Sequence, residues 1–158
     1  MNFKSTVTSD TKSIDNMIRR LGKVEDYEAE YGYFEGDIHQ SSGLDITALV
    51  TVLEEDRPFM SLAMELCDQK IEVSNQWKRD LWDYLRGNGT IVSFYKLIGK
   101  IGEKAVEDAI QYGDWINTHP NSPDWAEYKF VKYGVSQPLI ETGEMLYSVK
   151  SKASKRKT

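Results

Sequence analysis

The chain has 158 residues, of which 40% are hydrophobic and 28% charged, as is ordinary for one soluble globular domain with its own core. Its single cysteine, Cys67, excludes an intramolecular disulfide, and no apolar run approaches the ~20 residues of a membrane-spanning helix. The first residues lack the apolar core of a secretory signal, so we expect a protein that is made and used in a cytoplasm.

The net charge of −5 is distributed unevenly along the chain. Five of the 20 Lys and Arg residues lie within residues 150–158, which contain no acid, so residues 1–149 carry a net charge of −10. We therefore expect a single α+β domain over residues 1–149 and a basic, flexible tail over residues 150–158. The acidic domain would repel nucleic acid, whereas the tail could contact nucleic acid or an acidic protein surface.

The N-terminal third alternates between predicted strands and helices. Residues 3–9, rich in Thr and Val, predict an edge strand, and apolar residues at helical spacing then predict a helix that ends near Gly22. Tyr27–Phe34 alternates aromatic with polar or small residues, which is typical of a strand with one aromatic face. After glycine-containing loops, Asp45 is placed to cap a short helix over Ile46–Glu54.

The central part of the chain predicts two long helices. Pro58 suits a first helical turn, and apolar residues recur at helical spacing from there to about Leu85, where a glycine-rich break follows. The second helix runs from about Ile91 to Tyr112. Gly99 and Gly102 lower its helix propensity by about 1 kcal/mol each against alanine, and they would suit close packing of the helix.

The last third predicts a long connection and a short final segment. Residues 113–132 are irregular and contain Trp and Pro, as in the long ordered loops that often form contact surfaces. A turn region over residues 136–143 leads to a short amphipathic segment, Glu144–Lys150. Strands and helices mix without regular alternation, so we predict an α+β fold. Its small mixed or antiparallel sheet would pack against two long helices, with an extended loop and a C-terminal strand.

No combination of residues predicts a catalytic or metal site. His39 and His119 are far apart in sequence and lack the paired spacing of zinc ligands. Cys67 has no evident base partner and is expected to be a structural, half-buried residue. No glycine pattern of a phosphate-binding loop is present. We therefore expect no cofactor, no metal and no enzymatic activity, and an enzyme with a carboxylate-based site is the weaker alternative.

Candidate contacts to partner chains are charged residues and exposed aromatic residues. The acidic run before Arg57 could bind a cation or pair with a basic neighbour, although a solvated helix end is the simpler interpretation. Tryptophans belong first to the core and second to oligomer contacts. The candidate contact residues are Glu54, Glu55, Asp56, Arg57, Trp115, Trp125, Lys150, Lys152, Lys155, Arg156 and Lys157.

Four segments in sequence order resemble one protein family. They are Tyr31-Gly32-Tyr33-Phe34-Glu35-Gly36, Arg57-Pro58-Phe59-Met60, the helical stretch Gly102–Gly113, and Pro138–Val149 with its Pro-Leu-Ile-Glu-Thr-Gly start. Together they resemble the tail-completion or neck proteins of tailed bacteriophages, which include head–tail joining, virion morphogenesis and minor tail proteins. The resemblance covers residues 10–150. The motif residues are Tyr33, Phe34, Gly36, Pro58, Phe59, Pro138, Leu139, Thr142, Gly143 and Ser148. The chain differs from the family before Arg57, where Leu53–Asp56 replaces a longer loop.

The resemblance implies a structural virion protein that forms a ring, commonly a hexamer, at the head–tail interface, completing the tail and joining it to the connector. It implies contacts with further copies of the chain, with tail-tube or terminator proteins and with head connector proteins, and no membrane. Phage DNA would pass through the lumen without sequence-specific binding, and we expect part of the acidic domain to face that channel. The protein would be assembled in the cytoplasm of the host bacterium and located in the virion neck or tail.

Two other functions remain as alternatives. Within the same family, the protein could be a terminator that caps the growing tail tube. In a different class, it could be a small nucleic-acid-binding module that uses the basic tail.

Overall fold

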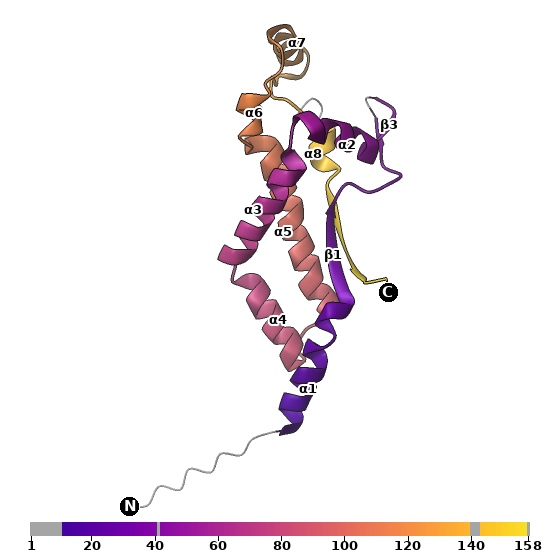
Figure 1. Cartoon of the computed structure of the whole chain (residues 1–158), viewed down its shortest axis with the longest axis vertical. Coiled ribbons are helices and arrows are strands. Elements are labelled where there is room, and N and C mark those ends of the chain that lie inside the picture. The colour runs from indigo at the N-terminus through magenta and orange to yellow at the C-terminus, as the bar shows by residue number, and fades with distance from the viewer. Residues whose placement is uncertain (1–10, 41, 140–142, 158) are drawn as a thin grey trace, which may run out of the picture.

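The computed structural model describes residues 11–40, 42–139 and 143–157, so the strand predicted over residues 3–9 and the motif residue Thr142 lie outside the described residues. The molecule is elongated, and helix α5 (Ile91–Tyr112) runs along its middle (Figure 1). Helices combine with two small antiparallel sheets, so the predicted α+β class is confirmed.

The other elements lie around α5. The helices are α1 (Thr11–Leu21), η1 (Val24–Asp26), α2 (Ile46–Asp56), α3 (Phe59–Val73), α4 (Gln76–Arg86), α6 (Trp115–Thr118), α7 (Pro123–Tyr133) and α8 (Glu144–Tyr147). The strands are β1 (Tyr27–Gly32), β2 (Ile38–His39), β3 (Leu44–Asp45) and β4 (Lys150–Lys155). Strand β1 pairs with β4, and β2 pairs with β3.

Local capping explains where several helices begin. As predicted, Asp45 caps α2, because its carboxylate accepts hydrogen bonds from the backbone N–H groups of Thr47 and Ala48. The Thr90 hydroxyl caps α5 by accepting from Ser93 N–H. The Ser122 hydroxyl caps α7 in the same way, with Pro123 following it.

The single long helix predicted from Pro58 to Leu85 is wrong, because the chain forms two helices there. Ser74 adopts an extended backbone conformation after α3, and α4 begins two residues later. The Trp77 indole then donates a 2.7 Å hydrogen bond to the Ile71 carbonyl across the break. The apolar periodicity continues through both helices, so it does not reveal the turn between them.

The irregular connection predicted over residues 113–132 is also wrong. Helices α6 and α7 occupy most of it, and α7 forms the end of the molecule farthest from α1 (Figure 1). The signal for α7 was available locally, since a serine followed by a proline is typical of a helix start. The tryptophan and proline content of the segment favours a loop when the sequence is considered alone.

The flexible basic tail is corrected for most of its length. Residues Lys150–Lys155 form β4, which pairs with β1 in antiparallel register from Tyr27 opposite Lys155 to Gly32 opposite Lys150. A C-terminal strand is present, but it lies in the residues predicted as the tail, whereas Glu144–Tyr147 in the predicted last segment forms helix α8. The domain therefore extends past residue 149. Pairing is favoured because the acidic β1 and the basic β4 have complementary charge, and because α5 packs on both strands.

Two glycines of α5 allow this close packing. A Cβ atom on Gly102 would lie 2.2 Å from the ring of Tyr31, and one on Gly99 would lie 2.8 Å from the Cβ atom of Ser151. Any larger residue at either position would push the helix off the sheet. The lower helix propensity of the two glycines is thus offset by the approach of α5 to β1 and β4.

The core follows α5 in two clusters. The larger one lies toward the C-terminal half of α5 and is completed by α3, α6 and α8; its buried members are Phe59, Ala63, Val106, Ala109, Ile110, Trp115, Met145 and Leu146. The smaller one joins α4 to the first turns of α5 through Tyr84, Ile91 and Phe94. Such a core along one helix leaves the elements at both ends of the molecule only partly covered.

Candidate functional site

The segments that carry the family resemblance meet around the larger core cluster. The Tyr33 hydroxyl donates a 2.8 Å hydrogen bond to the backbone carbonyl of Met145. Phe59 is fully buried, with its ring centroid 6.4 Å from that of Trp115. The Ser148 hydroxyl donates a 2.7 Å hydrogen bond to the Glu144 carbonyl and so closes α8.

The remaining described motif residues shape the backbone of the same region. Gly36, at φ +89°, donates its N–H to the carboxylate of Asp45 at 3.2 Å. Gly143, at φ +76°, precedes α8 in a left-handed conformation that glycine adopts readily. Further motif residues are Pro58 before α3, the buried Pro138, Leu139 at φ +58°, and Phe34, whose ring lies 4.4 Å from the Lys152 ammonium.

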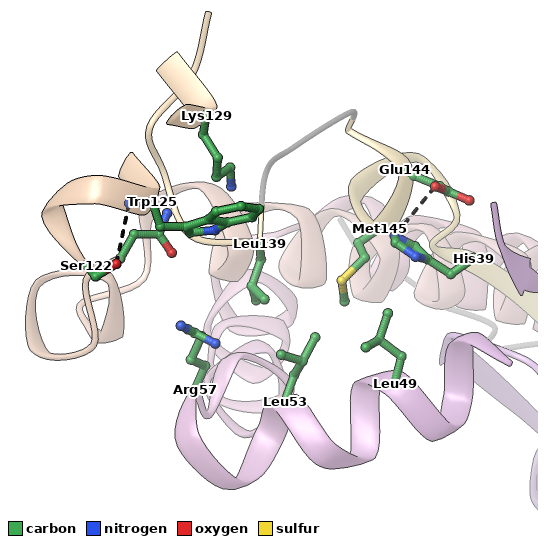
Figure 2. Close-up of a pocket in the computed structure, with 11 residues that line it drawn as sticks. His39, Leu49, Leu53, Arg57, Ser122, Trp125, Lys129, Leu139, Glu144 and Met145 are labelled. Atoms are coloured by element: carbon green, nitrogen blue, oxygen red, sulfur yellow. Dashed lines mark hydrogen bonds and ion pairs between the residues drawn. The ribbon is translucent and has the colours of Figure 1, made fainter. Parts of the chain in front are cut away.

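A cavity of about 390 Å³ lies beside this region, between α2, α7 and the start of α8 (Figure 2). Its volume is within the range of small-molecule sites. Its apolar walls are Leu49, Leu53, Trp125, Leu139 and Met145, and its polar groups are His39, Arg57, Asn121, Ser122, Lys129 and Glu144.

The polar groups divide between the two ends of the cavity. Figure 2 shows Arg57 and Lys129 extending toward Trp125 from opposite sides, while His39 and Glu144 lie together at the other end. His39 Nε2 is 3.5 Å from Glu144 Oε2, so this pair is an ion pair when the histidine is protonated. The carboxylate of Glu144 also accepts a hydrogen bond from Gln40 N–H.

The cationic end is unusual because both of its charges are partly or fully withdrawn from water. The Lys129 side chain belongs to a residue only 2% exposed, and its ammonium donates a 2.7 Å hydrogen bond to the Gln137 carbonyl. Arg57 has no carboxylate partner among the described residues, and its buried Nε–H has no acceptor there. Burying the Arg57 Nε–H without an acceptor is unfavourable, so this end of the cavity attracts a hydrogen-bond acceptor that carries negative charge.

The acidic run next to Arg57 serves the fold at one position. The Glu54 carboxylate accepts 2.8 Å hydrogen bonds from the N–H groups of Met60 and Ser61. It also accepts a 2.6 Å hydrogen bond from the Ser61 hydroxyl. It thereby satisfies free N–H groups at the start of α3. Glu55 and Asp56 are exposed at the end of α2 and remain candidate contacts.

The two tryptophans predicted as candidate contacts differ in their environment. Trp115 is corrected to a core residue, because it is 4% exposed and its indole donates a 2.8 Å hydrogen bond to the Ala109 carbonyl. Trp125 is 44% exposed on α7 and stacks on Tyr128 with 5.1 Å between ring centroids. Trp125 therefore remains available to a partner and also lines the cavity.

The basic residues of the former tail lie along the acidic strand. Three of them form ion pairs, which are Lys150 with Asp37, Lys152 with Glu30, and Arg156 with Glu28. Lys155 and Lys157 are exposed. Pairs this exposed contribute little stability each, but they lower the positive potential that the tail would present to nucleic acid.

Two groups of exposed apolar side chains lie at opposite ends of the molecule. On α1, Ile14, Ile18 and Leu21 share one helical face and are all more than half exposed. At the other end, α7 exposes Trp125, Tyr128, Phe130 and Val131. The sequence predicted the α1 face but not that it would remain uncovered. It predicted a contact surface in residues 113–132, including Trp125, but as an irregular loop and not as the helix α7.

Helix α1 is nevertheless held in a defined position. Arg20 Nη1 donates a 3.0 Å hydrogen bond to the Leu85 carbonyl, and the Tyr84 hydroxyl donates a 3.1 Å hydrogen bond to the Arg20 carbonyl. These bonds fix the last turn of α1 to the end of α4. The apolar face of α1 takes no part in this attachment.

Reactive and metal-binding groups are sparse in the part of the chain that the structure describes. No group of three or more His, Cys, Asp or Glu side chains could hold a metal ion there. Within the same residues, no helix is both long and apolar enough to span a bilayer. Cys67 is buried in α3, and this burial raises the pKa of its thiol, as suits a structural residue.

Comparisons with protein-family models, curated proteins and solved structures found no match for the chain.

Proposed function

We propose that this chain is a structural subunit of a tailed phage. Copies of it assemble through two different surfaces into a ring at the interface between the phage head and the phage tail. In that ring it completes the tail and joins it to the connector. The observation that supports assembly is the pair of exposed apolar helix faces, on α1 and on α7, at opposite ends of an elongated molecule (Figure 1). The phage setting is supported by the resemblance of the four motif segments.

Hydrophobic burial favours contact between these faces. A surface helix of a stable domain normally covers its apolar stripe, yet Ile14, Ile18 and Leu21 of α1 are left in water. Burying one such side chain contributes about 1.5–3 kcal/mol. Clustered exposed apolar residues commonly mark protein interaction sites.

The two faces differ, so the contact between copies would be heterologous. The aliphatic face of α1 on one copy would pack on the aromatic and aliphatic surface of α7 on the next. Heterologous contacts produce a closed ring when the rotation between copies closes, and a filament when it does not. A subunit that bonds through its two ends is suited to either outcome.

The charge of the chain is compatible with a ring that surrounds DNA. The chain carries a net charge of −5, and an acidic channel wall lets DNA slide instead of binding it. The nucleic-acid-binding alternative draws no support from residues 150–157, where three of the five cations are paired with carboxylates of β1 and its flanking loop.

The test is electron microscopy of lysates of the parent phage from which this gene has been deleted. The wild-type gene or a variant is then supplied to the deletion phage. DNA-filled heads beside free tails of normal length would support the joining role. Tail tubes of uncontrolled length would instead assign the terminator role. Normal infectious particles without the gene would overturn a structural role at the neck.

Complementation then separates assembly from folding. Ile18→Asp, which places a charge in the α1 face, should fail to restore particles. Val73→Asp is the matched control, because Val73 is an exposed apolar residue at the end of α3, away from α1 and α7. Equal complementation by both variants would exclude the α1 face from assembly.

A further inference from the structure

We propose that the cavity between α2, α7 and α8 is a binding site for a carboxylate attached to an apolar group. The cavity holds about 390 Å³, enough for a compact acid of roughly ten heavy atoms on the scale of known ligand sites. This inference does not depend on the proposed ring, because every group that it uses belongs to one copy of the chain.

Arg57 supplies the anion-binding group. Its guanidinium lines the cavity, and its buried Nε–H lacks an acceptor in the described part of the chain. A carboxylate would accept two parallel N–H groups from such a fork, which gives a charge-assisted and directional contact. The carboxylate would also provide the missing acceptor for Nε.

Lys129 strengthens the same end of the cavity. Its side chain is almost completely buried, and its ammonium is held by the Gln137 carbonyl. A fixed cation in a region of low dielectric acts on a bound anion more strongly than a surface lysine does. Arg57 and Lys129 together therefore place two positive charges on either side of Trp125 (Figure 2).

The walls select what is attached to the carboxylate. Leu49, Leu53 and Met145 line the stretch between the cationic end and the pair formed by His39 and Glu144. An apolar group fits this stretch, whereas a second negative charge there would approach the Glu144 carboxylate. This arrangement favours one carboxylate on an apolar body over a phosphate ester or a dicarboxylate.

The required chemistry has two sources, namely a free small acid and the carboxyl terminus of a peptide that ends in an apolar residue. Both present a carboxylate beside an apolar group.

The test is calorimetric titration of the full-length protein with matched acids and amides. The first pair is 3-phenylpropionate and its neutral isostere 3-phenylpropionamide. The second pair is an acetylated tetrapeptide ending in leucine, with a free or an amidated carboxyl terminus. We expect a carboxylate ligand that binds in the cavity to bind at least about tenfold more tightly than its amide. The amide cannot form the charged hydrogen-bonded pair with Arg57.

Two variants locate the binding. Arg57→Gln should weaken binding of the carboxylate by about tenfold or more, and Arg86→Gln should leave it unchanged. Arg86 is the matched control, because it is an exposed arginine over the Trp82 ring at the end of α4, far from the cavity. Should Arg57→Gln fail to fold, the comparison of acid with amide on the wild-type protein decides alone.

Each outcome has a definite meaning. Tighter binding of 3-phenylpropionate than of the peptide assigns a free acid as the ligand, and the reverse assigns a peptide terminus. The proposal is overturned when neither carboxylate binds, when the amides bind as tightly as the acids, or when Arg57→Gln binds like wild type. Tighter binding of inorganic phosphate than of both carboxylates would also overturn it.

Discussion

The Tyr33 hydroxyl donates a 2.8 Å hydrogen bond to the backbone carbonyl of Met145, which connects the end of the first strand region to α8 across 112 residues of sequence. Burial raises the pKa of Tyr33, so the hydroxyl is protonated and acts as a donor at neutral pH. The bond thus fixes two motif segments together beside the cavity.

Replacing Tyr33 by phenylalanine should lower the free energy of unfolding by about 1–3 kcal/mol. The change removes the donor and leaves the partly buried Met145 carbonyl without it. Urea unfolding followed by circular dichroism measures this loss. Tyr147→Phe is the control, because Tyr147 is 81% exposed, and equal midpoints for both variants would contradict the structural role of the bond.

Gly102→Ala should destabilise the protein by about 1–3 kcal/mol, because the new Cβ would lie 2.2 Å from the Tyr31 ring and overpack the contact between α5 and β1. Thermal unfolding is the measurement. Gly89→Ala is the matched control, since its Cβ would meet its nearest atom at an ordinary 3.5 Å. A wild-type melting temperature for Gly102→Ala would show that α5 does not pack this closely.

A chain that ends after Val149 should melt at least about 5 °C below wild type. We expect the truncation to lower the free energy of unfolding by about 2 kcal/mol, which corresponds to about 4–8 °C in a domain of this size. The truncation removes β4 from β1 and uncovers α5. A chain that ends after Lys155 keeps the whole of β4 and serves as the control. Unchanged melting of the shorter chain would restore the flexible tail predicted from the sequence.

Asp108 should make a pH-dependent contribution to stability. Burial acts to raise the pKa of its carboxyl, but hydrogen bonds from Lys70, at 2.6 Å, and Lys104, at 3.2 Å, outweigh it and hold the pKa below its usual value. The lower folded pKa means that the contribution is complete above the unfolded value of ~3.9 and is lost as the pH falls through the folded value.

Asp108→Asn should therefore lower stability by about 0.5–1 kcal/mol at pH 7 and by less at pH 2.5, which lies below the pKa of the unfolded carboxyl, so that part of the wild-type contribution is already lost. Urea unfolding at both pH values measures the difference. Glu65→Gln, at an exposed position of α3, should show no such change between the two pH values. An equal loss at both would mean that packing, not charge, accounts for the effect.

Ile18→Asp on α1 and Phe130→Asp on α7 should each abolish self-association, because each places a charge in one of the two proposed contact faces. Light scattering coupled to size-exclusion chromatography measures the mass. A heterologous contact also makes a sharper prediction for an equimolar mixture, since one intact α1 face and one intact α7 face remain. The mixture should form dimers although neither variant does so alone, whereas an interface of α1 with α1 would let Phe130→Asp form dimers by itself.

Features that depend on near neighbours in the chain could be predicted from the sequence. The cap of α2 at Asp45, the extent of α5 and the α+β class follow from local hydrogen-bonding groups and from apolar periodicity, which nearby residues are enough to define.

Features that depend on distant partners are defined only in the tertiary structure. Lys150–Lys155 forms a strand because β1 lies beside it, with carboxylates for its cations, 118 positions or more earlier in the chain. Trp115 is buried because α3 and α8 close over it, and Arg57 lines a cavity because α7 folds back above α2. Short-range pattern does not encode which surfaces meet, since the free energy of burial is gained only when residues far apart in sequence come together.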